Sequence, residues 1–227
     1  MKIGETIAIE FNAFSKNYTN DMIGCVPHYL SLISSFTKHL PNNFNPKSIL
    51  DLGSGNGNVT AQLISYFPNA TFTLVDASTE MINLCRNQFK GYDFIYANKY
   101  FKDFLFKEEN YDLIVAGFSL HHCDENEKQS IFKNINTSLK KGGIFLYSDL
   151  MISKTNPNHS VLLKQWKEFV NNNFSDEKKW TWLMEHYEAF DKPTDYLVQI
   201  EWMRNAGFIN IQIPFQEEYW TLLQAVK

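Results

Sequence analysis

The chain has 227 residues, and 44% of them are hydrophobic, so it can bury a sizeable core. Its net charge of −4 and lack of a long basic run argue against broad attraction to nucleic acids or anionic membranes. The three cysteines are widely spaced without zinc-type pairing, and no apolar run approaches the ~18 residues of a membrane span. These features, and the absence of a signal-peptide pattern after Met1, predict a cytoplasmic protein with reduced thiols.

The first 47 residues predict a helical cap in front of the main domain. Two helices are expected, joined near Asn20 to Gly24, with Pro27 in the first turn of the second helix. Proline is tolerated there because the first turn of a helix has no internal partner for that backbone N–H.

Short apolar runs alternate with amphipathic stretches from Ser48 onward. Such alternation is typical of βαβ units, which build a parallel sheet with helices on both faces. The expected strands are 48–52, 71–76, 92–97, 111–119 and 143–149, and the expected helices are 58–67, 78–89 and 124–140.

The pattern changes after Asp149. Residues 158–190 carry helical segments without a strand, and a further helix is expected over 194–205. Two final strands at 208–213 and 218–226, separated by a turn around Pro214 and Phe215, should pair antiparallel. We therefore expect one domain over 1–227, with a cap (1–47), a core (48–150), a helical lid (151–193) and a closing unit (194–227).

A glycine-rich turn follows the first strand, in "SILDLGSGNGNVT". Glycines at 53, 55 and 57 allow a ligand to approach the backbone closely at the start of the next helix. A phosphate cradle would need a lysine after the last glycine, and a dinucleotide site would need the spacing GxGxxG; neither is present. A plain strand-to-helix turn remains an alternative on this feature alone.

An acidic residue, Asp76, ends the second strand, "TFTLVD". Neighbouring parallel strands end at the same edge of a sheet, so Asp76 should stand beside the glycine loop, where a carboxylate can accept bonds from ribose hydroxyls. The alternative is that Asp76 caps the next helix, although Ser78 can already take that role.

Four motifs together resemble the class I S-adenosylmethionine-dependent methyltransferases: "ILDLGSGNGNVT", "FTLVDASTEM", "YDLIVAGFSLHH" and "INTSLKKGGIFLYSD". They occur in that family's order over about 48–149, and "WMRNAGFINIQI" with "YWTLLQAVK" is similar to its closing strand pair. The resemblance implies a Rossmann-like α/β fold. Its seven-stranded, mostly parallel sheet would have an antiparallel last strand and helices on both faces.

The resemblance also implies a site for S-adenosylmethionine. The methionine part would be held around the glycine loop, the ribose by Asp76, and the sulfonium would lie near the end of the fourth strand. Asn98 stands where the family commonly has an acid that accepts the adenine amino group, and its amide oxygen can accept that bond. The implied cofactor residues are Tyr18, Asp51, Gly53, Ser54, Gly55, Gly57, Asp76, Ala77, Met81, Asn98, Gly117 and Phe118.

His121 and His122 are the candidate catalytic residues, because they follow the fourth strand at the mouth of the sheet. Either could act as a general base, anchor the substrate, or merely cap and pack the turn. Without further ligands at metal spacing they predict no metal site. A nucleophilic role for the adjacent Cys123 is disfavoured, since the resembled family transfers methyl groups directly.

The segment after the fifth strand is rich in aromatic residues and is expected to roof the acceptor site. An aromatic cage would suit a cationic or planar acceptor, whereas the alternative is that these rings only form the core of the roof. The candidate substrate residues are Asp149, Trp166, Trp182, His186 and Tyr187.

The sequence therefore predicts transfer of a methyl group from S-adenosylmethionine to a small molecule, by a monomer or homodimer. The alternatives are a tRNA- or protein-modifying methyltransferase, an enzyme similar to carboxy-S-adenosylmethionine synthases, and a non-catalytic nucleotide sensor. The synthase alternative would need cations near the sulfonium, and the chain has only two arginines, Arg86 and Arg204.

Overall fold

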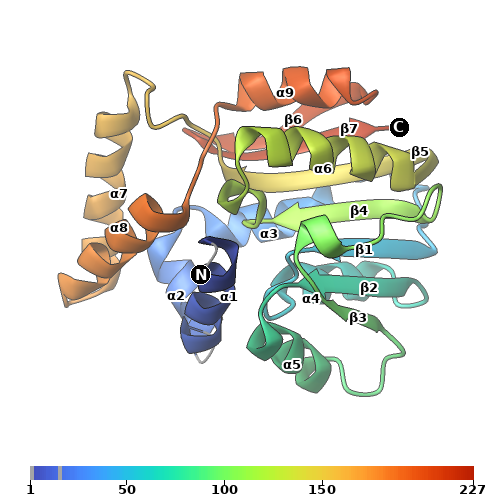
Figure 1. The fold of residues 1–227 in the computed structure, drawn as a ribbon, viewed down its shortest axis with the longest axis horizontal. Helices are drawn as coiled ribbons and strands as arrows, with labels where there is room; N and C mark the ends of the chain where they lie inside the picture. Colours follow the sequence, from blue (N-terminus) through green and yellow to red (C-terminus); the bar gives the residue numbers. More distant parts are fainter. Residues whose placement is uncertain (1–2, 15–16) are drawn as a thin grey trace.

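The computed structural model describes residues 3–14 and 17–227, and its centre is one seven-stranded sheet in the order β3-β2-β1-β4-β5-β7-β6. Neighbouring strands among the first five in chain order pair parallel, whereas β7 pairs antiparallel with both β5 and β6. This arrangement confirms the expected Rossmann-like α/β fold with its reversed last strand (Figure 1). The strands are β1 (Ser48–Leu52), β2 (Thr71–Asp76), β3 (Ile95–Asn98), β4 (Tyr111–Gly117), β5 (Leu139–Leu150), β6 (Ile209–Glu217) and β7 (Trp220–Val226).

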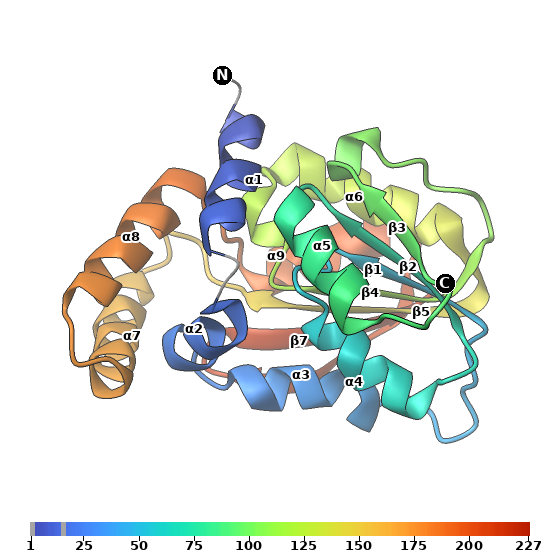
Figure 2. The ribbon, with the colours of Figure 1, turned by 90° about the horizontal axis from the view of Figure 1, so that it is seen from below.

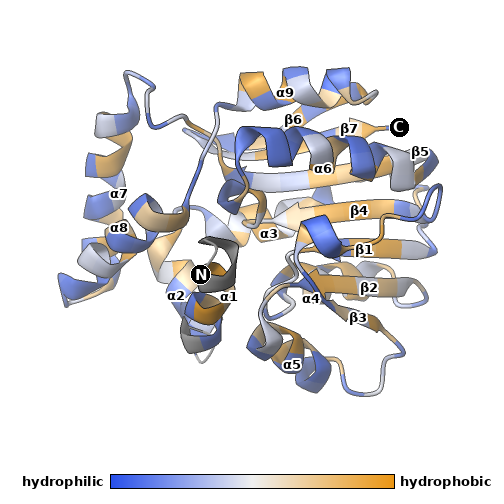
Figure 3. Ribbon diagram, in the orientation of Figure 1, coloured by the Kyte–Doolittle hydropathy of each residue, from blue (hydrophilic) through white to orange (hydrophobic). Residues whose placement is uncertain are grey.

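Helices cover both faces of the sheet (Figure 2). Buried residues of α3 and α4 pack on one face, and those of α6 and α9 pack on the other. The strands between them are buried along most of their length and carry mainly apolar residues in their middle parts, which Figure 3 shows along β1, β2 and β4. The helices are α1 (Ile3–Phe14), α2 (Tyr18–Cys25), α3 (Tyr29–Lys38), α4 (Asn58–Tyr66), α5 (Thr79–Gln88), α6 (Glu125–Ser138), α7 (His159–Asn173), α8 (Lys178–Phe190) and α9 (Tyr196–Asn205).

The N-terminal segment differs from the expected pair of helices. Three helices occupy it, and the stretch Asn20 to Gly24, expected as a joint, lies inside α2. This polar stretch is helical because α2 packs against α7, a contact that local sequence does not reveal. Pro27 lies in the turn before α3 rather than in its first turn. Positions 1–2 and 15–16 of the expected cap lie outside the described residues.

Several strand boundaries also differ from the expected ones, and the fourth strand ends at Gly117 rather than at 119. The third strand begins at Ile95 rather than at 92, and the fifth extends back to Leu139 through the glycine pair. Pro214 and Phe215, expected in a turn, lie within β6, and the chain turns at 218–219 instead. Pro214 is tolerated because β6 is an edge strand, where a missing backbone N–H need not break the ladder.

The helices α1, α2, α7 and α8 gather beyond the carboxyl ends of the parallel strands (Figures 1 and 2). Trp166 of α7 fixes part of this assembly by donating from Nε1 to the carbonyl oxygen of Cys25 at 2.5 Å. No helix among the described residues has the length and apolar character needed to cross a bilayer.

Candidate functional site

A cavity of about 440 Å³ opens where β1, β2 and β4 end, and we call it the loop cavity. Its volume lies in the range of small-molecule sites. Gly55 of the glycine loop and Asp76 at the end of β2 line one side of it. Ile7, Ala8 and Phe11 of α1 line another side. The cavity therefore lies at the strand ends, where open α/β sheets bind ligands.

The three glycines of the loop are needed for two different structural reasons. Gly53 has a φ of 73°, and a Cβ there would lie 2.2 Å from the Cβ of Ser119, so this position needs glycine for packing. The same holds for Gly57, where a Cβ would meet Phe89. Gly55 instead faces the cavity, where an added Cβ would only make ordinary contact with the Tyr18 ring. Gly55 is thus the position that leaves backbone open to a ligand.

Asp76 connects the loop to the second strand. Its two oxygens accept hydrogen bonds from the backbone N–H groups of Gly55 and Ser78, both at 2.8 Å. Ser78 caps α5 by accepting from Met81 N, as expected. Burial raises the pKa of Asp76 to about 6, against the opposing effect of these hydrogen bonds.

Asp51 is buried behind the loop and does not line the cavity. It accepts a hydrogen bond from the Thr60 hydroxyl at 2.6 Å, which fixes the start of α4 against β1. Burial raises its pKa to about 7, and the nearby charge of Asp76 adds to the increase.

The structure brings together seven of the twelve residues expected at the cofactor. Those lining the loop cavity are Tyr18, Gly53, Gly55, Asp76, Ala77, Met81 and Phe118. The five that do not line it are Asp51, Ser54, Gly57, Asn98 and Gly117. Asn98 holds the turn after β2, because its amide donates to the carbonyl oxygens of Asp76 and Ala77 while its oxygen accepts from Thr79.

Helix α1 is a part of the site that the sequence patterns did not identify. Its Asn12 accepts through Oδ1 from the Ser78 hydroxyl at 2.6 Å and from the backbone N–H of Glu80 at 3.2 Å. These bonds hold α1 over the start of α5, so Phe11 closes the loop cavity. No motif marks these residues, since the contact joins segments far apart in the chain.

A second, smaller cavity of about 80 Å³ lies under α7 and α8, and we call it the lid cavity. All five residues expected to contact the substrate line it, together with His121. Its wall is largely aromatic and apolar. Phe11, Tyr18 and Phe118 line both cavities, so the two are neighbours. Phe118 holds a left-handed backbone with a φ of 53°, a strained conformation that is often found at functional sites.

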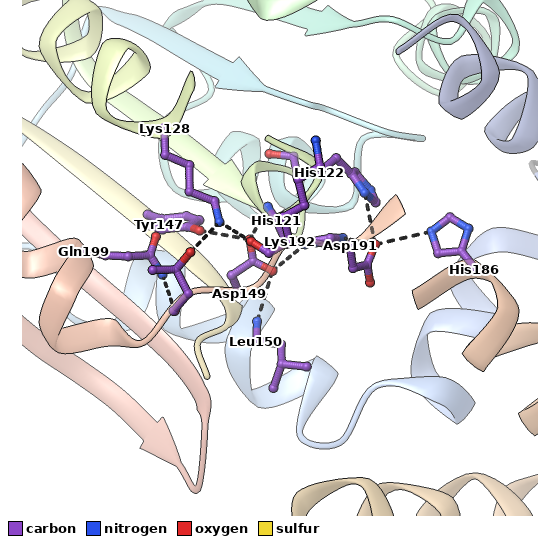
Figure 4. A network of polar contacts seen from close by, with 12 residues as sticks. His121, His122, Lys128, Tyr147, Asp149, Leu150, His186, Asp191, Lys192 and Gln199 are labelled. Carbon is purple, nitrogen blue, oxygen red and sulfur yellow. Dashed lines mark hydrogen bonds and ion pairs between the residues drawn. The ribbon is translucent and has the colours of Figure 1, made fainter. Parts of the chain in front are cut away.

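A polar cluster lies beside the two cavities (Figure 4). His121 Nδ1 lies 2.5 Å from Asp149 Oδ1, and His122 Nδ1 lies 3.1 Å from Asp191 Oδ1. His121 Nε2 and His186 Nε2 each lie 3.7 Å from that same Asp191 oxygen. The histidine–aspartate cluster consists of His121, His122, Asp149, His186 and Asp191.

The two adjacent histidines have opposite electrostatic environments. Burial lowers the pKa of His121, but the charges of Asp149 and Asp191 outweigh it and raise the value to about 9. Burial, together with the neighbouring His121, lowers the pKa of His122 to about 4. Asp191 retains a lowered pKa despite its burial, because His121 favours its charged form.

Surrounding hydrogen bonds fix the cluster in place. Asp149 accepts from the backbone N–H of His121 and from the Tyr147 hydroxyl, each at 3.0 Å. The backbone N–H of Lys192 donates to the His121 carbonyl at 2.7 Å, which brings Asp191 to the histidines. Buried Lys128 holds the same segment by donating from Nζ to the Lys192 carbonyl at 2.5 Å.

A family model described as a methyltransferase domain matches residues 49–143, which span β1 to the middle of β5. The strand order, the glycine loop and Asp76 all lie in or around this match. Residues 49–143 therefore form a methyltransferase domain, and the strand order around them is that of the class I S-adenosylmethionine-dependent fold.

Proteins that are similar to this chain are named for different activities. A carboxy-S-adenosyl-L-methionine synthase of Nautilia profundicola is 26% identical over 91% of this chain and 89% of its own length. A demethylmenaquinone methyltransferase of Thermotoga maritima is 25% identical over 78% of this chain and 76% of its own length. The solved structure of human N-acetylserotonin methyltransferase with S-adenosylmethionine has a TM-score of 0.62 at 16% identity, covering 97% of this chain and 56% of that one. This last similarity supports the fold.

Proposed function

We propose that the chain transfers the methyl group of S-adenosylmethionine, bound in the loop cavity, to a small molecule bound in the lid cavity. The observation that carries this proposal is that two neighbouring cavities share Phe11, Tyr18 and Phe118 as a common wall. A direct displacement needs donor and acceptor at adjacent sites.

The described residues fit the proposed cofactor. Gly55 leaves space for the donor's amino acid part, and the half-buried carboxylate of Asp76 can accept from ribose hydroxyls through its remaining lone pairs. When bound, S-adenosylmethionine supplies an electrophilic methyl group on a positively charged sulfur. Helix α1 and the lid would exclude water from the two cavities.

The lid cavity indicates the kind of acceptor. Trp166, Trp182 and Tyr187 form an apolar, aromatic wall, while His121 and Asp149 provide polar groups at one end. An acceptor with a planar or apolar body and one nucleophilic atom would match the chemistry of this wall, and α7 and α8 would move outward to admit it, because the cavity of about 80 Å³ is smaller than typical ligand sites. We propose His121 and His122 as the residues that face its nucleophilic atom, with His121 oriented by Asp149.

A second candidate function is the synthesis of a carboxylated cofactor, since several relatives carry the name carboxy-S-adenosyl-L-methionine synthase. Lys99 and Lys102 line the loop cavity, but no arginine lines either cavity among the described residues. Arg86 instead lies over the Tyr96 ring, 4.4 Å from its centroid. The missing arginine favours methyl transfer over this alternative.

Mass spectrometry of the reaction products separates these functions. The purified protein would be incubated with S-adenosylmethionine and a panel of phenols, thiols, amines and carboxylic acids. Methyl transfer predicts an acceptor heavier by one methylene together with demethylated cofactor. A carboxylated cofactor would support the second function, and no turnover despite cofactor binding would contradict both and support a nucleotide sensor.

We further propose that the acceptor is a free small molecule and that the protein acts in the cytoplasm as a monomer or homodimer. The net charge of −4 disfavours a nucleic-acid substrate. The cysteines Cys25, Cys85 and Cys123 are all free, which suits a reducing compartment.

A further inference from the structure

We propose that the histidine–aspartate cluster binds one divalent transition-metal ion of the zinc class, through His121, His122 and Asp191. Three imidazole nitrogens surround a single oxygen, Asp191 Oδ1, at 3.1, 3.7 and 3.7 Å. They come from two separate segments, the turn after β4 and helix α8, and Asp191 follows directly after α8. Figure 4 shows the side chains of His122 and His186 directed at Asp191.

The distances match those between ligand atoms around one ion. Zinc binds imidazole nitrogen and carboxylate oxygen at about 2.0–2.2 Å, so two ligands of a tetrahedral site lie roughly 3.4 Å apart. The distances from Asp191 Oδ1 to the three imidazole nitrogens are close to this value: the distance to His122 is slightly shorter, and the distances to His121 and His186 are slightly longer. One ligand atom each from His121, His122 and Asp191 also lies within 4.8 Å of the others.

Two facing atoms of the cluster, His122 Nδ1 and Asp191 Oδ1, lack hydrogen-bond partners that a cation between them would replace. Among the described residues, both ring nitrogens of His122 are buried and have no hydrogen-bond partner. Asp191 Oδ1 also has none, although His122 Nδ1 is only 3.1 Å away, because the contact lacks hydrogen-bond geometry. Buried polar atoms without partners are costly, and an ion between His122 and Asp191 would satisfy these two facing atoms at once.

The residues behind the cluster are those expected around a metal-bound histidine. A ligating imidazole usually donates its other ring nitrogen to a carboxylate, which fixes the ring and its tautomer. His121 has this arrangement: Nε2 faces Asp191, while Nδ1 lies 2.5 Å from Asp149. Asp149 is held in turn by the Tyr147 hydroxyl at 3.0 Å.

A purely structural explanation is that the cluster only connects the lid to the sheet through side-chain contacts. Such a connection would use a well-aligned hydrogen bond from His122 to Asp191, whereas their contact at 3.1 Å lacks that alignment. The donor set of two imidazoles and one carboxylate suits zinc or a neighbouring first-row ion better than magnesium or calcium and leaves a fourth position open.

The sequence alone predicts no metal here, because Asp191 and His186 are remote from the histidine pair along the chain. An ion at the cluster would lie between the cavities, since His122 lines the loop cavity while His121 and His186 line the lid cavity. If the proposed methyl transfer holds, the acceptor would bind this ion through an oxygen or sulfur atom. That consequence rests on the proposed function, whereas the metal site does not.

Zinc binding to the full chain tests the site without any assay of activity. Protein freed of metal by chelation would be titrated with zinc chloride by calorimetry. The proposal predicts one zinc ion per chain in the wild type. It predicts at least tenfold weaker binding in His122→Gln and Asp191→Asn. The matched control is His159→Gln, a lid histidine bonded to the Tyr187 hydroxyl outside the cluster, which should bind zinc as the wild type does.

A wild type that takes up no stoichiometric zinc would overturn the proposal, whether or not a variant fails to fold. Unchanged affinity in folded His122→Gln and Asp191→Asn would also overturn it, because the zinc would then be bound elsewhere. Asp149→Asn adds a readout of positioning: loss of its carboxylate should weaken zinc binding about tenfold to 100-fold. Catalytic inactivity of a protein that still binds zinc would count against the proposed function alone.

Discussion

Two carboxylates, buried Asp51 and half-buried Asp76, link the glycine loop to strands β1 and β2. Burial raises the pKa of Asp51 to about 7 and that of Asp76 to about 6, so both change charge near neutral pH. A cationic ligand beside them favours their ionised forms. Cofactor binding at this site should therefore be linked to proton release.

We expect the affinity for S-adenosylmethionine to rise between pH 5 and pH 8. Below about pH 6 the free protein holds Asp76 protonated, and ligand binding must expel that proton. Calorimetry in buffers of different ionisation enthalpy would measure both the affinity and the protons released. An affinity that stays constant over this range would contradict the role of the two carboxylates.

The same two groups should make the free protein less stable as the pH rises. Their folded-state pKa values lie above the ordinary value, so folding favours their neutral forms. The stabilising contribution is complete below about pH 4 and is lost as the pH rises through about 6 to 7. Urea unfolding of Asp51→Asn, compared with the wild type over this range, should show a weaker pH dependence.

At the level of single residues, sequence patterns identified the site unevenly. Asp76 and Gly55 could be placed because they lie in a local motif at a strand end. Asp191 could not, since a hydrogen bond between Lys192 and His121 brings it to the histidines from the far side of the lid. Asn98 and Asp51 carry polar groups in the expected places, but the structure directs them to backbone and to Thr60.

At the level of elements, the strand ends and the lid helices line different cavities. The ends of β1 and β2 with the start of α5 line the loop cavity, whereas α7 and α8 line only the lid cavity. The two sites should therefore respond separately to substitution. Met81 of α5 and Trp182 of α8 are suitable probes, since each lines one cavity only.

We expect Trp182→Ala to raise the KM for the acceptor at least tenfold while leaving the affinity for S-adenosylmethionine within about twofold. The indole supplies acceptor-facing surface, and its loss removes apolar contact there. Met81→Ala is the matched control and should weaken cofactor binding instead. Steady-state kinetics with an acceptor found by screening, and cofactor calorimetry, measure the two effects. The reverse pattern would mean that the cavities are wrongly assigned.

Elements with strong local signals were predicted well. Strands β1 and β2 match their expected ranges because both are short apolar runs bounded by turn residues. The N-terminal helices and the turn before β7 were predicted incorrectly. In the first case contact with α7 stabilises a weak helix, and in the second an edge position tolerates Pro214.

At the level of the whole molecule, the sheet is the source of stability. Leu146 in β5 has 0% of its surface exposed and lies between the parallel strands and the antiparallel pair. Leu146→Ala should lower the free energy of unfolding by about 2–5 kcal/mol. The control Leu105→Ala, at a side chain that is 71% exposed, should change it by less than about 0.5 kcal/mol. Equal losses in urea unfolding would contradict the assigned core.

The central claim is that the chain binds S-adenosylmethionine at the glycine loop, with Asp76 as a principal contact. Calorimetric titration of the wild type and Asp76→Ala with this compound and its demethylated product tests it most directly. We predict one site per chain, weakened in Asp76→Ala by roughly 1.5–3 kcal/mol, or about tenfold to 150-fold. No binding by the wild type, or equal affinity in the two proteins, would contradict the account.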